Sequence, residues 1–524
     1  MRQRSLLAIG LFACMAPVAG AQEPGFRQES GFRVEEASIG QIHEALRAGT
    51  TTCRWIVNES LRRIEAYDKR GPALNAIVKL NPDALVVADS LDRRYRAGGP
   101  VGPLHCVPMI VKENMETLEL PTTAGSLALE GFLTGRDATM VRQIKAAGAV
   151  VVAKANMAEW AFSPYETVSS ILPGYSKNPY ALDRVTAGSS GGTAAAVAAS
   201  YGTVGLGTDT GNSIRGPSAH QALVGIRSTM GLTSRAGIVP LSLAADIAGP
   251  MARSVSDAVA VFQVVTGEDP ADPVTAAARG RPRVDYPAAL KVDGLRGARI
   301  GVLKQAYSRS STDPEVVRVF EQALSDLRRA GAIVIDSVGV DSLSAWQREQ
   351  SGSCNQFRHD LEAWLAEHGD RAPLKTLAEI VRSMRYHPSV ARRLEAVLAS
   401  DTIPLAENPG CASREAFRER LRGGVLAVME SQRLDALVYP TWSNAPRLIG
   451  DLNTPHGDNN QLFAPSTGFP ALTVPMGWLH DGTLPAGLQF FGRAWDEVTL
   501  IRLGYAYEQA TRHRRSPSTT PPLP

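Results

Sequence analysis

The sequence predicts an α/β protein, a single large domain with a central mixed, largely parallel, twisted sheet flanked by helices. Short apolar runs such as 107–111 are typical of strands buried on both faces. Segments with helical spacing followed by apolar runs recur along the chain, as a sheet with a substantial parallel part requires. No linker divides the 524 residues, because strand-like sequence lies on both sides of the long surface crossing at 270–287.

The first third of the chain alternates helices and short strands. Ser38 and Gln41 fit a capping box ahead of an amphipathic helix that ends at Gly49. The further elements predicted here are helices near 56–64, 82–97, 138–147 and 193–199, and strands near 75–78, 107–111, 149–153 and 204–206.

The remaining chain repeats the pattern around one helical insertion. Strands are predicted within 293–303 and at 333–335, 436–439, 471–474 and 487–491, with helices at 313–330 and 497–511. Residues 342–432 are charged and helical in pattern, and form a helical excursion from the domain at 35–513. The tail at 514–524 is rich in Pro, Ser and Thr, and is predicted to be disordered.

The first 21 residues have the composition of a signal peptide. Arg2 and Arg4 precede an apolar stretch that ends in a small-x-small cleavage site at 19–21. We therefore expect export to the periplasm or the medium after cleavage near Ala21, followed by a loose arm at 22–34. The apolar stretch is too short to span a bilayer comfortably. The formal net charge is only +3, which argues against a nucleic acid or an anionic membrane surface as partner.

Four cysteines remain after the leader: Cys53, Cys106, Cys354 and Cys411. In an oxidising compartment they could form disulfides, in any of three connectivities, although buried free thiols fit equally well. No cysteine spacing suggests zinc, and we expect neither a metal nor an organic cofactor.

Residues 186–217 contain two Ser/Gly clusters, at 188–192 and 211–213. Glycine lets the backbone approach a ligand closely, free N–H groups stabilise an oxyanion, and a serine can act as nucleophile. Two tight turns around a helix are the simpler interpretation.

Three residues could complete a catalytic serine site. Ser190 lies in a G-x-S-x-G motif, but a polar, proline-containing loop precedes it where a nucleophile elbow needs a strand. His220 could act on Ser213, although its place at the start of a helix favours a surface or supporting role. Lys112 follows an apolar strand, where burial would lower its pKa from about 10.4 and give a neutral base. A solvated lysine at a strand end is the alternative.

Three segments in this order, Cys106–Asn114, Ala187–Gly192 and Gly207–Pro217, resemble the amidase signature family. The neighbouring segments Ala146–Asn156, Gly231–Pro240 and Gly249–Arg253 also fit this family. The resemblance spans most of residues 37–511 and is weakest over 342–432. It implies the amidase signature fold and an enzyme that cleaves linear carboxylic amides.

The resemblance also implies a catalytic Ser-Ser-Lys triad. Ser213 would be the nucleophile, Lys112 the general base and Ser189, after a cis peptide bond, the bridging serine. The backbone N–H groups of Thr210, Gly211, Asn212 and Ser213 would form the oxyanion hole, with Ser190, Asp209 and Arg215 in support. The family usually has glycine where this chain has Asn212. If that position needs a positive φ, asparagine is the best substitute.

The sequence motifs specify the substrate-binding residues less clearly than the catalytic ones. Trp160, Phe162 and Ser163 match a pocket-lining segment of relatives such as fatty acid amide hydrolase, and 357–364 resembles the peptide-amidase branch. The expected partner is a small-molecule amide, with an ester, a carbamate or mere binding of an amide as alternatives. The glutaminase subunit of the tRNA amidotransferase shares the motifs, but a signal peptide argues against that role. The oligomeric state cannot be predicted.

Overall fold

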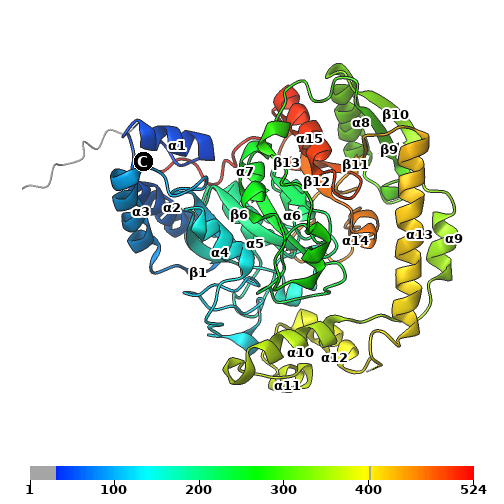
Figure 1. Cartoon of the computed structure of the whole chain (residues 1–524), viewed down its shortest axis with the longest axis horizontal. Helices are drawn as coiled ribbons and strands as arrows, with labels where there is room; N and C mark the ends of the chain where they lie inside the picture. Colours follow the sequence, from blue (N-terminus) through cyan, green and yellow to red (C-terminus); the bar gives the residue numbers. More distant parts are fainter. Residues whose placement is uncertain (1–30, 401–402) are drawn as a thin grey trace, which may run out of the picture.

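One eleven-stranded sheet runs through the chain in the computed structural model, which describes residues 31–400 and 403–524 (Figure 1). The strand order is β1 (Ile77–Leu80), β3 (Val150–Ala155), β2 (Pro108–Lys112), β6 (Val204–Asp209), β8 (Ile247–Ala252), β7 (Val224–Arg227), β12 (Ala471–Leu479), β13 (Leu484–Phe491), β11 (Ala436–Pro440), β9 (Arg299–Leu303) and β10 (Ile333–Val338). A separate hairpin joins β4 (Lys177–Asn178) and β5 (Ala181–Val185). The predicted signal peptide and residues 22–30 of the arm lie outside the described residues.

The predicted mixed sheet is confirmed, with a smaller parallel share than the sequence suggests. Four neighbouring strand pairs are parallel, and they lie toward the two ends of the sheet. The six other pairs are antiparallel and include all those from β6 to β11. The sequence analysis identified neither β7 nor β8, which supply much of this antiparallel centre.

Helices cover both faces of the sheet (Figure 1). The helices are α1 (Ile39–Arg47), α2 (Cys53–Tyr67), α3 (Ala84–Gly98), α4 (Thr139–Ala146), α5 (Gly191–Ala198), α6 (Arg215–Ala219), α7 (Val255–Val265), α8 (Pro314–Arg329), α14 (Phe463–Thr467) and α15 (Glu497–Thr511). The predicted capping box is present, because Ser38 and Gln41 exchange side-chain to backbone hydrogen bonds at the start of α1.

Strand β2 shows how the sheet separates two cores. Met109 and Val111 pack with α4 and α7 on one face, while Ile110 packs with α2, α3 and α5 on the other. Successive strand residues point to opposite faces, so Lys112 falls on the same face as Ile110, toward α5. Helix α5 approaches β6 so closely that a Cβ at Gly205 would lie 2.4 Å from Thr193 Cγ2.

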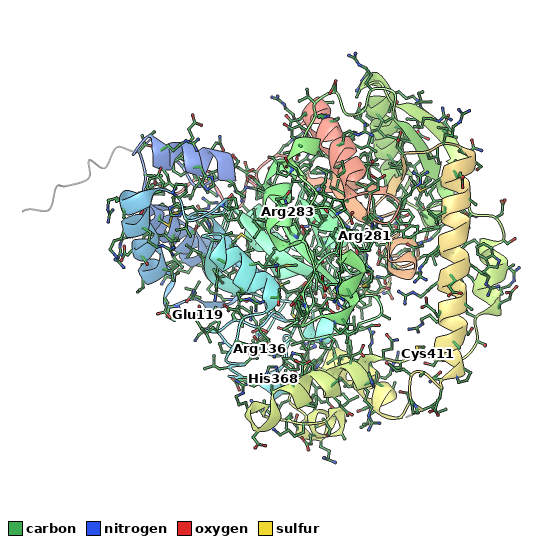
Figure 2. The ribbon with its side chains drawn as sticks, in the orientation of Figure 1. Glu119, Arg136, Arg281, Arg283, His368 and Cys411 are labelled. Carbon is green, nitrogen blue, oxygen red and sulfur yellow. A yellow bond between two sulfur atoms is a disulfide. The ribbon has the colours of Figure 1, made fainter. Side chains whose placement is uncertain are left out.

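The predicted helical excursion is confirmed in the described part of 342–432. It comprises α9 (Leu343–Glu349), α10 (Phe357–Glu367), α11 (Leu377–Ser383), α12 (Pro388–Leu398) and α13 (Pro409–Ser431). Buried Glu116 joins α10 to the main body, accepting from Trp364 Nε1 and His368 Nε2 at 2.9 Å each and pairing with Arg136 at 2.5 Å. Arg136 and His368 lie near each other at this junction (Figure 2).

Two disulfides resolve the open cysteine assignment. Cys53 pairs with Cys106, which joins α2 to the segment before β2. Cys354 pairs with Cys411, which joins the segment before α10 to the first turn of α13. Each disulfide closes a loop of more than 50 residues.

The prediction of a disordered tail at 514–524 is wrong. The tail returns to the start of the domain near α1 and α2 (Figure 1), where its carbonyl groups accept hydrogen bonds. Arg63 donates to the carbonyl oxygens of Thr520 and Pro521 at 2.8 and 3.0 Å. Extended, proline-rich backbone leaves carbonyl groups unpaired, and here buried cations use them as acceptors. Across the described chain, no helix combines the length and the apolar composition needed to cross a bilayer.

Candidate active site

Strands β2 and β6 bring the predicted base into the centre of the protein. The two strands are parallel, with Val111 opposite Leu206, so that their carboxyl ends meet at one edge. Lys112 Nζ lies 2.7 Å from Thr208 Oγ1, just past that register. The Lys112 side chain is fully buried, so the solvated alternative is excluded.

The first Ser/Gly cluster lies directly beside this amine. Ser189 Oγ is 2.8 Å from Lys112 Nζ, and the peptide bond between Gly188 and Ser189 is cis, as the resemblance implies. Ser190 donates to the Thr208 carbonyl at 3.2 Å and accepts from the Thr208 N–H at 3.4 Å. It therefore fixes the backbone of the residue whose hydroxyl contacts Lys112, a supporting role like the predicted one.

Burial prepares Lys112 to act as a base. It lowers the pKa of the ammonium from 10.5 to about 7, while the charges of Asp209 and Asp246 act in the opposite direction. Among the described residues no carboxylate forms an ion pair with Lys112. An amine with this pKa exists partly in the neutral form near neutral pH and can accept a proton.

The second Ser/Gly cluster forms a loop with unused donors. The N–H groups of residues 210–213 make no hydrogen bond within the described chain, whereas the next two, of Ile214 and Arg215, donate to Asp209. Four free N–H groups in one tight loop can bind an oxyanion, as predicted.

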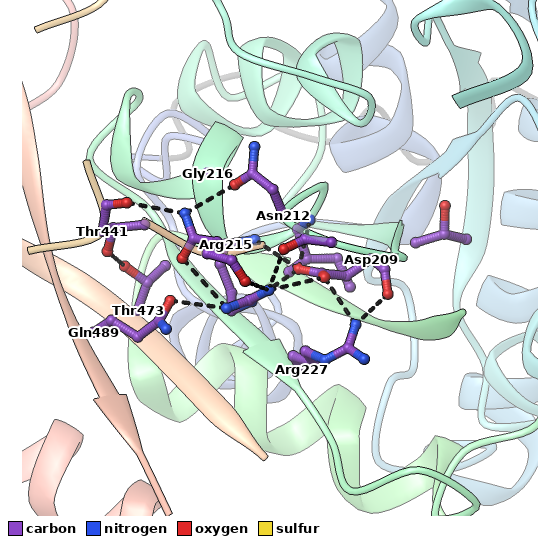
Figure 3. Close-up of polar contacts among 12 residues, drawn as sticks. Asp209, Asn212, Arg215, Gly216, Arg227, Thr441, Thr473 and Gln489 are labelled. Carbon is purple, nitrogen blue, oxygen red and sulfur yellow. Dashed lines mark hydrogen bonds and ion pairs between the residues drawn. The ribbon is translucent and has the colours of Figure 1, made fainter. Parts of the chain in front are cut away.

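A buried ion pair fixes this loop from behind. Asp209 receives Arg215 Nε at 3.0 Å and Arg227 Nη1 at 2.8 Å, and all three side chains are fully buried (Figure 3). Burial alone would raise the pKa of Asp209, but the two guanidinium groups hold it well below its usual range. The predicted bracing by Asp209 and Arg215 is confirmed, while Arg227 was not anticipated.

Asn212 does not have the positive φ that the sequence analysis considered. Its side chain bridges two segments. Nδ2 donates to the carbonyls of Pro164 and Gly188 at 3.1 and 3.4 Å. On the other side Oδ1 accepts from Asn460 at 3.1 Å, a contact drawn at the Asn212 side chain in Figure 3. A Cβ at Gly216 would lie 1.9 Å from Asn212 Oδ1, so a glycine at 216 makes room for this side chain.

A cavity of about 950 Å³ opens onto the loop. Ser213, the three preceding residues and Phe162 line it, and it extends to the helical excursion, where Phe357 completes the wall. Lys112 and Ser189 are not on the wall and lie buried behind it.

Of the three predicted substrate residues, only Phe162 lines the cavity. Trp160 is buried in the core around Phe357, and Ser163 accepts from the Tyr165 N–H at 3.3 Å beside the wall. The wall residues contributed by the excursion escaped prediction, because no local signal in a helix shows which cavity it borders.

His220 is unsuited to act as the base for Ser213. It is buried rather than at the surface, its ring stacks on Trp442 with ring centroids 4.3 Å apart, and among the described residues no side chain forms a hydrogen bond with its ring nitrogens. Burial lowers its pKa to about 3, so the ring stays neutral.

The site combines a buried amine beside one serine with a loop of free N–H donors that carries a second serine. These are the groups that a serine hydrolase needs for catalysis.

The sequence profile of the amidase family matches residues 55–501. A probable amidase of Arabidopsis thaliana is 33% identical, covering 94% of this chain and 93% of its own. The crystal structure of the peptide amidase from Stenotrophomonas maltophilia superimposes with a TM-score of 0.84 at 39% identity, covering 92% of this chain and 99% of that one. A glutamyl-tRNA(Gln) amidotransferase subunit of Symbiobacterium thermophilum is 33% identical over 91% of this chain and 98% of its own.

These similarities confirm the resemblance found in the sequence. The chain belongs to the amidase family and is an amide-hydrolysing enzyme.

Proposed function

We propose that the protein hydrolyses linear carboxylic amides through an acyl-enzyme on Ser213, with Lys112 as general base and Ser189 as proton relay. The observation that carries the assignment is the 2.8 Å contact between the fully buried Lys112 amine and Ser189 Oγ. Family membership supports the same roles, because the triad is typical of amidase signature enzymes.

In this mechanism the substrate carbonyl oxygen lies against the free N–H groups of residues 210–213. Ser213 attacks the carbonyl carbon and passes its proton to Ser189, which passes its own proton to neutral Lys112. The relay then reverses, the leaving amine receives a proton and the C–N bond breaks. Water follows the same route to hydrolyse the ester and release the acid.

The preferred substrates under this proposal are primary amides at the carboxyl end of peptides. Similarity to the peptide amidase over 92% of the chain supports this choice, as does a cavity large enough for several residues. Esters and carbamates remain the alternative, because the same attack cleaves them.

The proposal places the enzyme outside the cytoplasm. The leader-like residues 1–21 and the two disulfides Cys53–Cys106 and Cys354–Cys411 support an oxidising compartment. Cell fractionation and the mass of the mature protein test this, with an amino terminus expected near Gln22. Full-length protein retained in the cytoplasm would contradict export without affecting the catalytic proposal.

Replacing the nucleophile tests the mechanism. We expect Ser213→Ala to lower kcat on peptide amides by a factor of about 10⁴ or more. Wild type incubated with an activated ester should gain the mass of one acyl group on Ser213, and the variant should not. Ser466→Ala is the matched control, because Ser466 lines the same cavity from a different element, α14. Wild-type turnover in Ser213→Ala would refute the assignment, and a panel of amides, anilides, esters and carbamates ranks the substrate classes.

A further inference from the structure

The cavity beside Ser213 has an unbalanced charge. Three arginines line it, Arg393 from α12 and Arg414 and Arg418 from α13, and no Asp, Glu, Lys or His is among its described lining residues. General basicity does not explain this excess, because the chain has 55 Lys and Arg against 52 Asp and Glu.

Arg418 is occupied in building the wall. It donates to the carbonyls of Ser466 and Pro465 at 3.0 and 3.2 Å, and pairs with Glu415 at 3.4 Å. With most of its donors engaged and a carboxylate nearby, Arg418 has little capacity left for a ligand.

Arg393 and Arg414 have N–H groups that are available to a ligand. Arg393 lies over the Phe162 ring at 4.2 Å and gives one N–H to the Phe162 carbonyl at 2.7 Å; its other N–H groups donate to no described residue. Arg414 makes no hydrogen bond and no ion pair with any described residue. It lies one helical turn before Arg418 on the same side of α13.

Within the described chain, neither guanidinium pairs with a carboxylate that would offset its charge. Partial burial lowers the pKa of both Arg393 and Arg414; only the Tyr165 phenol counteracts this effect, at Arg393, and no described group does so at Arg414. Arg414 also lowers the pKa of Arg418, so the positive charges act on each other across this wall. A bound anion would relieve the repulsion and would receive charge-assisted hydrogen bonds.

Covalent and aromatic contacts hold this cationic wall near the loop. The Cys354–Cys411 disulfide fixes the first turn of α13, three residues before Arg414. Phe357 packs against Phe162 with ring centroids 4.7 Å apart, and Arg393 stacks on the same Phe162. The two arginines are solvent-exposed, but they line the cavity from elements that these contacts fix relative to the site.

We infer that the substrate carries a carboxylate apart from its scissile amide, and that Arg393 and Arg414 bind it. This inference rests on the proposed function and specifies its substrate class, acid-bearing amides such as peptide amides with an acidic side chain. The two arginines select the substrate and take no part in bond cleavage.

Matched peptides test the inference. Acetylated tripeptide amides with Glu at each position in turn are compared with the same peptides carrying Gln, an isosteric neutral residue. For at least one position we expect wild type to prefer the Glu peptide in kcat/KM by about tenfold, the effect of one charge-assisted contact. The preference should shrink as salt is added.

Variants locate the effect. Arg393→Gln and Arg414→Gln should each raise KM for the preferred Glu peptide about tenfold and change kcat/KM for its Gln partner less than twofold. Arg392→Gln is the matched control, because Arg392 is exposed like Arg393 and adjacent to it in sequence, but does not line the cavity. Unchanged selectivity in both cavity variants would overturn the inference.

Failure of the inference differs from failure of the proposed function. Equal hydrolysis of Glu and Gln peptides at every position overturns the inference and leaves the amidase assignment intact. If wild type hydrolyses none of these amides, the proposed substrate class fails, and calorimetric binding to Ser213→Ala then decides the inference. Selective binding of Glu peptides supports it, and equal or absent binding overturns it.

Discussion

Lys112 sets the pH dependence of the proposed reaction. Burial lowers its pKa from 10.5 to about 7, so the amine is protonated below that pH and free above it. Only the free amine can accept the proton from Ser189. We therefore expect kcat to rise with pH and to level off above about 7. Measuring kcat between pH 5 and about 9 on a neutral amide gives the profile.

The control for this prediction is Lys112→Ala, which should lose most activity together with the rise near pH 7. A variant that retains the wild-type profile would assign the titration to another group and exclude Lys112 as the base.

Asn212 links the two Ser/Gly clusters, because its amide donates to the Gly188 carbonyl, one residue before Ser189. Asn212→Gly should lower kcat about tenfold and reduce the unfolding temperature, since buried carbonyls lose a donor at a cost of about 1–3 kcal/mol each. Asn212→Asp should be worse, because it turns a carboxylate oxygen toward the carbonyls of Pro164 and Gly188. Kinetics and thermal unfolding of both variants test this.

Asn212→Gly removes the side chain, whereas Asn212→Asp keeps its shape and removes its hydrogen-bond donor. Comparing the two variants therefore separates the effect of side-chain shape from that of the hydrogen bonds. Full activity in Asn212→Asp would show that the bridge to Gly188 does not position the serines. The sequence analysis did not identify this bridging role, because the partners Pro164 and Asn460 are distant in the chain.

At the level of elements, regular patterns were predicted well and irregular ones were not. The helix at 497–511 and the strand beginning at Ala436 match α15 and β11, because long periodic or apolar runs depend mainly on local sequence. Strand β8 contains Gly249 and Pro250, and β7 is only four residues long and ends in a buried arginine. Their pairing depends on tertiary contacts that no local pattern encodes.

The candidate site also has a part that local sequence predicts and a part that depends on the tertiary fold. Lys112 and the two serine clusters lie at or beside the ends of β2 and β6, within short motifs that a sequence can display. The cationic wall comes from α12 and α13, more than 170 residues after Ser213. Its arginines look like ordinary helix-surface charges until the fold brings them to the cavity.

For the molecule as a whole, the carboxyl-terminal tail connects the start of the domain to the side of the sheet that α5 covers. Arg514 binds Glu36 at 2.7 Å, Tyr180 Oη at 3.1 Å and the Ala222 carbonyl at 2.9 Å. Arg514→Ala leaves Glu36 without this partner and should lower stability by about 1–3 kcal/mol. For a domain of this size that corresponds to a fall of a few degrees in unfolding temperature, measured by calorimetry.

Truncation after Arg515 is the matched control, because it removes the proline-rich end and keeps Arg514. It should cost less than Arg514→Ala, since it loses only contacts such as those from Arg63 to residues 520 and 521. Both variants should keep wild-type kcat, because no residue of 514–524 lines the cavity beside Ser213. An unfolding temperature unchanged in both variants would show that the tail rests on the surface without stabilising the fold.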